Sequence, residues 1–337
     1  MKNVAKKSLI IAGGIIGGIV AFIVLMAFLF VLLEPAIFNG FYKTAAKEFD
    51  TPGKDDGFVQ QGLEYVDGTF LTCGYMGDGK SASRIYITEG TKYENRKTEY
   101  VCLYFEDGSA VTSHAGGLSH FGDYVYLCDS EGDPARIIVF SLDEILSAEN
   151  GGKVFAKGFF EVDNNASFCY VKDGTLYVGE YYKAKRFPTK EEHAMTAPDG
   201  SKHAATIFGY YLDENGEFGL QDYDADFVYS ICDTVQGMCI TDGGQIVLST
   251  SFALMTSHHY YYDLPQGEAE GEFSLDGREI PLWYLDSNDL TKDVKLPPMS
   301  EEIVFVDGRI YVMNESACNK YLFGKLLRAK YIWSYAA

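Results

Sequence analysis

The chain of 337 residues carries 28 basic and 48 acidic side chains, so its formal net charge is −20. A surface this acidic repels phosphate backbones and excludes a nucleic-acid-binding protein. The seven cysteines are an odd number without a C-x-x-C pair, which excludes complete disulfide pairing and a zinc site built on such pairs.

The first predicted element is an apolar segment, residues 8–33, which contains no charged side chain. A helix of these 26 residues, at a rise of about 1.5 Å each, exceeds a hydrocarbon core of about 30 Å. A cleavable signal peptide has an apolar region of only about 7–15 residues and a small-x-small cleavage site, which residues 32–35 (Leu-Leu-Glu-Pro) do not offer. The segment is therefore predicted to be a retained transmembrane signal anchor.

The charges beside this segment predict its orientation. Three lysines precede it within residues 1–7, and basic residues favour the cytoplasmic side of a membrane. We therefore expect residues 1–7 to be a cytoplasmic tail and the C-terminal domain, which carries a formal charge of −23 once residues 1–33 are removed, to be extracytoplasmic. Gly13, Gly14, Gly17 and Gly18 form two overlapping small-xxx-small pairs. Such pairs predict close contact between two helices in a dimer; the alternative is that these glycines have no such role, because glycine is common in membrane helices.

Residues 34–57 are predicted to be a spacer, helical around residues 41–49, and residues 58–337 then contain one motif five times. Each copy is a strand, a turn of Asp and Gly, and a second strand, which is a strong hairpin signal. The turns are Asp67-Gly68, Gly122-Asp123, Asp173-Gly174, Asp242-Gly243 and Asp307-Gly308. Their spacings of 56, 50, 69 and 65 residues leave room for about four strands each, the size of a propeller blade. The sequence predicts an all-β, five-bladed β-propeller; its long spacings leave a count of six open.

The segments between the turns predict further strands and two insertions. Residues 153–160 are expected to be a strand of blade two, and insertions are expected at residues 183–204 in blade three and 252–280 in blade four. Blade five ends with residues 330–335 and lacks a fourth strand. We expect the segment after the anchor to supply that strand, because a closed ring leaves no free sheet edge.

Three inner-strand segments share a pattern with one known family. Residues 58–63 (Phe-Val-Gln-Gln-Gly-Leu) are followed by a glycine-rich loop that reaches Ser83. Residues 236–238 read Gln-Gly-Met, and residues 301–308 read Glu-Glu-Ile-Val-Phe-Val-Asp-Gly. These segments resemble the plant-type glutaminyl cyclotransferases, with their Phe-Thr-Gln-Gly-Leu, Glu-Gly-Trp-Gly-Leu and Asn-Glu-Leu-Glu strands. The resemblance implies a five-bladed propeller with a site in the central funnel.

Two positions depart from this family. Its blade-two strand, Phe-Gly-Glu-Gly-Ile, carries the acid thought to act on substrate, whereas residues 114–118 here read His-Ala-Gly-Gly-Leu, with Gly116 in place of the acid. The tryptophan of blade four is replaced by Gly237. The resemblance therefore supports the fold and weakens the prediction of cyclotransferase activity.

The first strands of propeller blades line the axis, so the residues at their starts are expected to converge. We predict a ligand-binding site there, with an axial divalent cation such as calcium as a candidate guest. The alternative is that these residues are polar because water fills the channel. The predicted site residues are Gln61, His114, Gln236, Glu301 and Glu302, with Gly116, Asn164, Asn165 and Ser167 nearby.

Two functions follow from these residues. The favoured one is a binding module, not an enzyme, that recognises a small polar ligand, glycan or peptide at the funnel. The alternative is an acyl- or amide-transfer enzyme, in which His114 and Glu302 form an acid/base pair if they lie within hydrogen-bond reach. The lost family acid at Gly116 favours the binding module.

Overall fold

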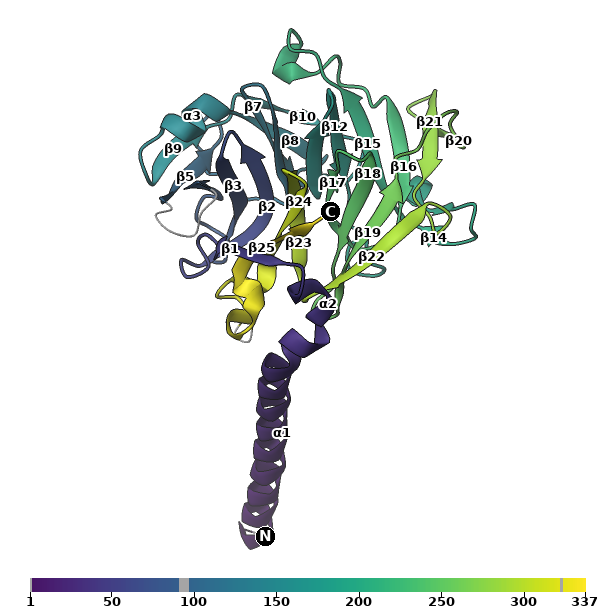
Figure 1. The fold of residues 1–337 in the computed structure, drawn as a ribbon. Coiled ribbons are helices and arrows are strands. Elements are labelled where there is room, and N and C mark those ends of the chain that lie inside the picture. Colours follow the sequence, from purple (N-terminus) through teal and green to yellow (C-terminus); the bar gives the residue numbers. More distant parts are fainter. Residues whose placement is uncertain (1, 91–96, 322–323) are drawn as a thin grey trace.

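The fold is an all-β, five-bladed propeller preceded by one apolar helix, as the sequence predicts (Figure 1). This computed structural model describes residues 2–90, 97–321 and 324–337. The five inner strands pack side by side around the axis and begin at the same end of the ring, which we call the mouth end. The turns that follow the inner strands lie at the opposite, far end.

Each blade contains four strands, and in blades one to four these run outward from the axis in chain order. Blade one contains β2 (Phe58–Val66), β3 (Thr69–Met76), β4 (Arg84–Glu89) and β5 (Thr98–Tyr104). Blade two contains β6 (Leu118–Phe121), β7 (Tyr124–Asp129), β8 (Arg136–Ser141) and β10 (Gly158–Glu161). Blade three contains β11 (Phe168–Lys172), β12 (Thr175–Gly179), β15 (Ala205–Tyr211) and β16 (Phe227–Ile231). Blade four contains β17 (Val235–Ile240), β18 (Gln245–Thr250), β19 (Ser257–Asp263) and β22 (Leu290–Leu296).

Blade five combines both ends of the propeller sequence. It contains β23 (Ser300–Val306), β24 (Arg309–Asn314), β25 (Tyr331–Ala336) and, at its outer edge, β1 (Ala46–Asp50), which pairs antiparallel with β25. The prediction that the segment after the apolar helix closes the ring is therefore confirmed. The predicted helix in this segment is confined to α2 (Asn39–Tyr42), since residues 46–50 form the closing strand.

Three of the five turns have the backbone conformation expected for a tight Asp-Gly hairpin. Both turn residues have positive φ at Asp67-Gly68, Asp173-Gly174 and Asp307-Gly308. In blade two the positive φ of 57° belongs to Gly122, and in blade four the turn extends to Gly244, with a φ of 75°. Glycine and aspartate tolerate this left-handed region better than most residues, which explains their recurrence.

Two predicted segments differ from the structure because strands pair across blades. Residues 153–160 form two strands: β9 (Gly152–Phe155), which pairs in parallel with β5 of blade one, and β10 of blade two. The predicted blade-four insertion contains β19, a regular strand of that blade, and then a hairpin of β20 (Gly271–Leu275) and β21 (Arg278–Tyr284). This hairpin joins blade three, because β21 pairs in parallel with β16.

The described helix α1 (Lys2–Ile37) is long and apolar enough, over Gly13–Ile37, to cross a membrane as an anchor or to serve as a signal sequence. Its last turns are bonded to the propeller. The buried Glu34 carboxylate accepts hydrogen bonds from the Tyr42 hydroxyl at 2.5 Å and from the Arg328 backbone N–H at 3.0 Å. In Figure 1, α1 leaves the propeller beside the yellow turns η4 (Gly324–Leu326) and η5 (Arg328–Lys330). Helix α3 (Leu142–Ser147) lies at the far end.

Candidate functional site

The axis of the propeller holds the buried side chain of Glu302, from β23. Its Oε2 accepts hydrogen bonds from the backbone N–H groups of Leu63, at 2.9 Å, and Leu118, at 3.0 Å. Its Oε1 accepts a longer one, 3.4 Å, from Cys169. Burial raises the pKa of Glu302, and the N–H donors oppose that rise. One carboxylate thus joins blade five to blades one, two and three.

Glycines make room for this carboxylate. A Cβ on Gly62 would lie 2.9 Å from Glu302 Oε2, and a Cβ on Gly117 would lie 2.4 Å from Oε1. A Cβ on Gly237 would lie 2.5 Å from the Cα of Glu302. The glycine that replaces the tryptophan of blade four therefore has a packing role, since any side chain there would displace the axial strand.

Gly116 also has no room for a side chain. A Cβ at this position would lie 2.2 Å from the backbone oxygen of Ser167 in blade three. The backbone here therefore excludes an acid at the position where the resembling family carries one.

A cavity of about 920 Å³ opens at the mouth end. Its wall includes residues from every blade: Gln61, His114, Ser167, Gln236 and Glu301. Four of the five predicted site residues therefore meet at one cavity. Glu302 is not among the lining residues, because its carboxylate is turned to the axis.

Three carboxylates, Glu131, Glu301 and Glu315, lie in the cavity wall. Glu301 lies 3.5 Å from the amide nitrogen of Gln236, and Glu315 accepts a hydrogen bond of 2.9 Å from the hydroxyl of Tyr321. Burial raises the pKa of both carboxyls, and the pKa of Glu301 is raised further by Glu315. The Lys320 ammonium, 3.5 Å from Glu315 Oε1, opposes these shifts. The cavity wall therefore combines carboxyls of raised pKa with two cations, Arg186 and Lys320.

His114 lies apart from Glu302. Its ring stacks on Tyr75 with 4.7 Å between the ring centroids, and the Tyr75 hydroxyl accepts a hydrogen bond of 2.6 Å from Lys320. Burial, together with the positive charge of Lys320, lowers the pKa of His114 to about 4. None of the described contacts joins His114 to Glu302, so the predicted hydrogen-bonded pair is not formed. At neutral pH His114 is an uncharged ring in an aromatic wall.

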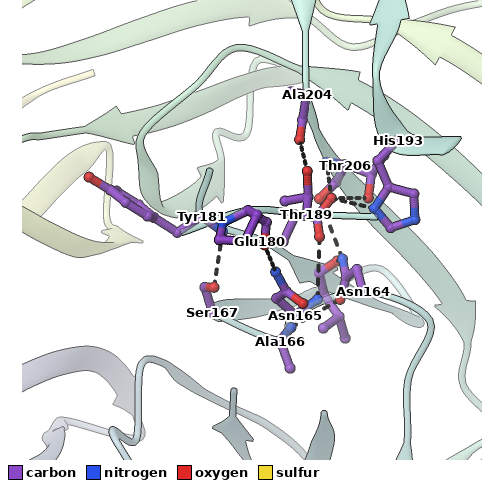
Figure 2. A network of polar contacts seen from close by, with 12 residues as sticks. Asn164, Asn165, Ala166, Ser167, Glu180, Tyr181, Thr189, His193, Ala204 and Thr206 are labelled. Atoms are coloured by element: carbon purple, nitrogen blue, oxygen red, sulfur yellow. Dashed lines mark hydrogen bonds and ion pairs between the residues drawn. The ribbon is translucent and has the colours of Figure 1, made fainter. Parts of the chain in front are cut away.

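The blade-three wall of the cavity is fixed by a buried polar network, shown in Figure 2. Glu180 Oε1 lies 2.7 Å from His193 Nδ1 and accepts hydrogen bonds from the N–H and hydroxyl of Thr206, at 3.0 and 2.9 Å. Asn165 donates to the backbone oxygen of Pro188 at 3.1 Å. These contacts attach the predicted insertion at residues 183–204, which includes the hairpin β13 (Met195–Thr196) and β14 (Lys202–His203), to blade three.

The donor set on the axis does not fit the predicted divalent cation. The N–H groups of Leu63 and Leu118 point at Glu302 Oε2 and occupy the lone pairs that calcium would use. Among the described residues, no group of three or more His, Cys, Asp or Glu side chains could hold a metal ion.

Sequence reasoning missed Glu315, Lys320, Tyr75 and Tyr321. Glu315 begins the turn η3 (Glu315–Ala317) after β24, and Lys320 and Tyr321 follow it, outside the repeated motif. One sequence feature could have indicated these residues: the long segment between β24 and β25, residues 315–330. The connection between β23 and β24, in the same blade, is only a two-residue turn.

No protein-family profile matches the chain, and neither does any curated protein. Among solved structures, it is similar to the PQQ-bound aldose sugar dehydrogenase of Streptomyces coelicolor, with 14% identity and a TM-score of 0.41 over 80% of this chain and 76% of that one. It is also similar to the Myxococcus xanthus glutaminyl cyclase, with 10% identity and a TM-score of 0.41 over 87% of this chain and 94% of that one. A third similar structure is the exo-β-1,3-galactanase of Phanerochaete chrysosporium, with 12% identity and a TM-score of 0.45 over 86% of this chain and 63% of that one. At these values the likeness is to coarse architecture alone.

Proposed function

We propose that the protein is a membrane-anchored, extracytoplasmic propeller that binds a small polar ligand, part of a glycan or a peptide, in the mouth cavity. The observation that carries the proposal is the convergence of polar side chains from all five blades on one cavity of about 920 Å³. Ligand sites typically have volumes of about 300–1,000 Å³ and a few convergent polar groups. The amides of Gln61 and Gln236 offer both hydrogen-bond donors and acceptors to such a ligand.

The acidic excess of the cavity wall favours a ligand that carries an ammonium group, since the wall contains Glu131, Glu301 and Glu315 against Arg186 and Lys320. Burial raises the pKa of Glu301 and Glu315, and Lys320 opposes both shifts only in part. A ligand cation placed between them would replace a bound proton and stabilise both ionised carboxylates. Binding should therefore release protons, and affinity should rise with pH through the range in which these carboxyls titrate.

Calorimetry on the full chain in detergent micelles tests this proposal. The probes are the tripeptide Gly-Ala-Gly against its N-acetylated form, and glucosamine against N-acetylglucosamine. We expect the amine-bearing member of at least one pair to bind more tightly, and the Glu301→Gln variant to weaken that binding about tenfold, the equivalent of one charge-assisted hydrogen bond. The matched control is Glu161→Gln, an exposed carboxylate on β10. Absence of binding heat from all four probes, or equal binding within each pair, would overturn the amine-binding proposal.

A second candidate is acyl- or amide-transfer chemistry at the same cavity. A carboxyl whose pKa is raised by burial is a candidate general acid, and burial raises the pKa of both Glu301 and Glu315. They are better placed than the His114 and Glu302 of the sequence-based alternative, since Glu302 is bonded to backbone N–H groups. The resembling family suggests the reaction: the α-amine of an N-terminal glutamine attacks its side-chain amide carbon, and ammonia leaves.

Ammonia release from the peptide Gln-Ala-Ala by the purified chain tests this second candidate. Ammonia production that is lost in Glu301→Gln and kept in Glu161→Gln would support an enzyme. Binding of amine probes without ammonia release would leave the binding module as the function.

A further inference from the structure

Basic side chains gather at the mouth end of this acidic protein. The blade-three connection, residues 181–190, contains four basic residues and no acidic one. Residues 319–330 of blade five likewise contain four basic residues and no acidic one. Arg186 and Arg328 are exposed within these two segments. Eight of the 28 basic residues in a chain of net charge −20 are thus concentrated in 22 positions at one end of the propeller.

Exposed apolar side chains accompany these charges. Phe187 in blade three is 54% exposed, and Leu254 and Met255 in the connection from β18 to β19 are 68% and 64% exposed. Leu326, in blade five, is 59% exposed. Phe187 and Leu254 also line the rim of the cavity. Large apolar residues that remain exposed beside basic ones are typical of a surface that lies on a membrane.

The blade-three and blade-four parts of this surface are held together. The Lys183 ammonium lies 4.3 Å from the centroid of the Phe252 ring, and the Arg186 guanidinium lies 5.6 Å from it. Tyr181 packs edge-on against Phe187, with 5.4 Å between the centroids. The blade-five part is bonded to the end of α1 through Glu34 and the backbone of Arg328. The blade-five part of the surface therefore adjoins the attachment of the apolar helix.

We propose that this surface contacts the anionic lipid headgroups of the membrane that α1 would span. We call it the mouth arc, and it consists of Arg186, Phe187, Leu254, Met255, Leu326 and Arg328. Its basic groups attract anionic lipids, and its apolar groups enter the interface between headgroups and acyl chains. Acidic residues at the mouth end include Asp78, Asp107 and Glu131 in blades one and two, and Asp55, which pairs with Lys325 of blade five. The exposed basic and apolar side chains of the mouth arc place blades three to five nearest the lipid, so the propeller would stand tilted.

This inference does not depend on a ligand, so its test differs from that of the binding function. The full chain is reconstituted into nanodiscs of phosphatidylcholine alone or of phosphatidylcholine and phosphatidylglycerol in equal parts, and amide hydrogen exchange is measured. Because α1 would hold every variant on the disc, a difference in amide hydrogen exchange reports contact between the mouth arc and the lipid. It does not report recruitment of the protein to the disc. We expect slower exchange over residues 181–190 and 252–256 in the anionic discs, and no change near α3.

Two double variants separate the contribution of the basic side chains to membrane contact from that of the apolar side chains. Lys185→Glu with Arg186→Glu should lower the protection by anionic lipid about fivefold for each charge removed, and Leu254→Ser with Met255→Ser should lower it in both lipids. The far-end controls are Lys172→Glu, beside the Asp173-Gly174 turn, and Leu146→Ser in α3, a leucine that is 44% exposed. These controls should leave the protection unchanged. Equal exchange at the mouth arc in anionic discs, neutral discs and detergent micelles would overturn the proposal, and so would greater protection near α3.

Discussion

The carboxylate of Glu302 accepts a hydrogen bond of 3.0 Å from the backbone N–H of Leu118, although 184 residues separate them in the sequence. The same oxygen accepts the N–H of Leu63, from another blade. Each inner strand of the propeller is hydrogen-bonded to the second strand of its own blade on one side only. Some of its backbone N–H groups therefore point at the axis. Glu302 accepts hydrogen bonds from such groups and is itself buried, so it acts as a polar core residue.

Replacing Glu302 by glutamine should destabilise the propeller. The amide NH₂ would face backbone N–H donors, and a buried donor without an acceptor costs about 1–3 kcal/mol. Urea unfolding of the full chain in micelles measures this loss, with Glu161→Gln as the exposed control. Unchanged stability of Glu302→Gln would show that the carboxyl is protonated and that its O–H already faces the donors.

Replacing Gly117 by alanine should also destabilise the fold. The new Cβ would lie 2.4 Å from Glu302 Oε1 and 2.8 Å from the Cα of Phe168, and overpacking of this kind costs about 1–3 kcal/mol or more. Gly243→Ala is the matched control, since its nearest neighbour, the Thr241 hydroxyl, is 3.6 Å away. If both variants unfold at the same urea concentration, the axis is looser than the structure indicates.

Stability should fall as the pH rises above the ordinary carboxyl range. The folded-state pKa of Glu301 is raised above its ordinary value of 4.5, so the folded protein holds this proton more tightly than the unfolded chain. The stability that results is fully present below about pH 4.5 and is lost as the pH rises through the folded pKa. Melting temperatures between pH 5 and 8 should therefore decline less steeply in Glu301→Gln. An identical slope in the variant and the parent would contradict the raised pKa.

Two histidines, one buried and one partly buried, should limit stability on the acid side. His259 lies between the Tyr335 hydroxyl, 2.7 Å from Nδ1, and the Ser300 hydroxyl, 3.0 Å from Nε2. Burial lowers its pKa from 6.5 to about 3, and that of His114 to about 4. The unfolded chain binds these protons first, so stability is lost as the pH falls below 6.5.

The His259→Gln variant isolates the larger of these contributions. It should be less stable than the parent at pH 7 but lose less further stability between pH 6.5 and 4 in urea titrations. His258→Gln is the control, because His258 is only partly buried and pairs with Asp293 at 2.8 Å. Parallel pH profiles for His259→Gln and the parent would rule out the neutral buried imidazole.

The apolar helix should remain on the mature protein. N-terminal sequencing of the membrane-extracted chain is expected to begin at Met1 or Lys2, since residues 32–35 offer no cleavage site. A start near Ala36 would instead identify a signal peptide. It would also remove Glu34 and with it the hydrogen bond to the backbone of Arg328.

The features that the sequence predicts are those encoded locally or by repetition. Asp67-Gly68 and its equivalents mark hairpins because their turn conformation is a property of two residues, and their recurrence gives the five blades. The parallel pairings of β9 and β21 depend on strands of other blades, so no local pattern indicates them. In the site, alignment on the turns finds Gln61, Gln236 and Glu301.

The direction of a side chain is harder to predict than its position along a strand. Glu301 and Glu302 are adjacent and chemically identical, yet one lines the cavity and the other fills the axis. A register change in the pairing of β23 with β24, between Ser300 and Ile303, falls at this place. Alternation counted from the Asp307-Gly308 turn therefore cannot assign the two side chains across the irregularity.

The pairing of β1 with β25 has a consequence for how the protein is made. Glu48 and Ser334, which are bonded across this pair, are 286 residues apart, and β1 precedes all the other strands in the chain. During synthesis β1 therefore has no partner until four complete blades and most of the fifth have followed it. The nascent propeller is an open ring with one unpaired edge strand, and closure of that ring is the step at which the exposed edge, a site for wrong pairing with other chains, disappears.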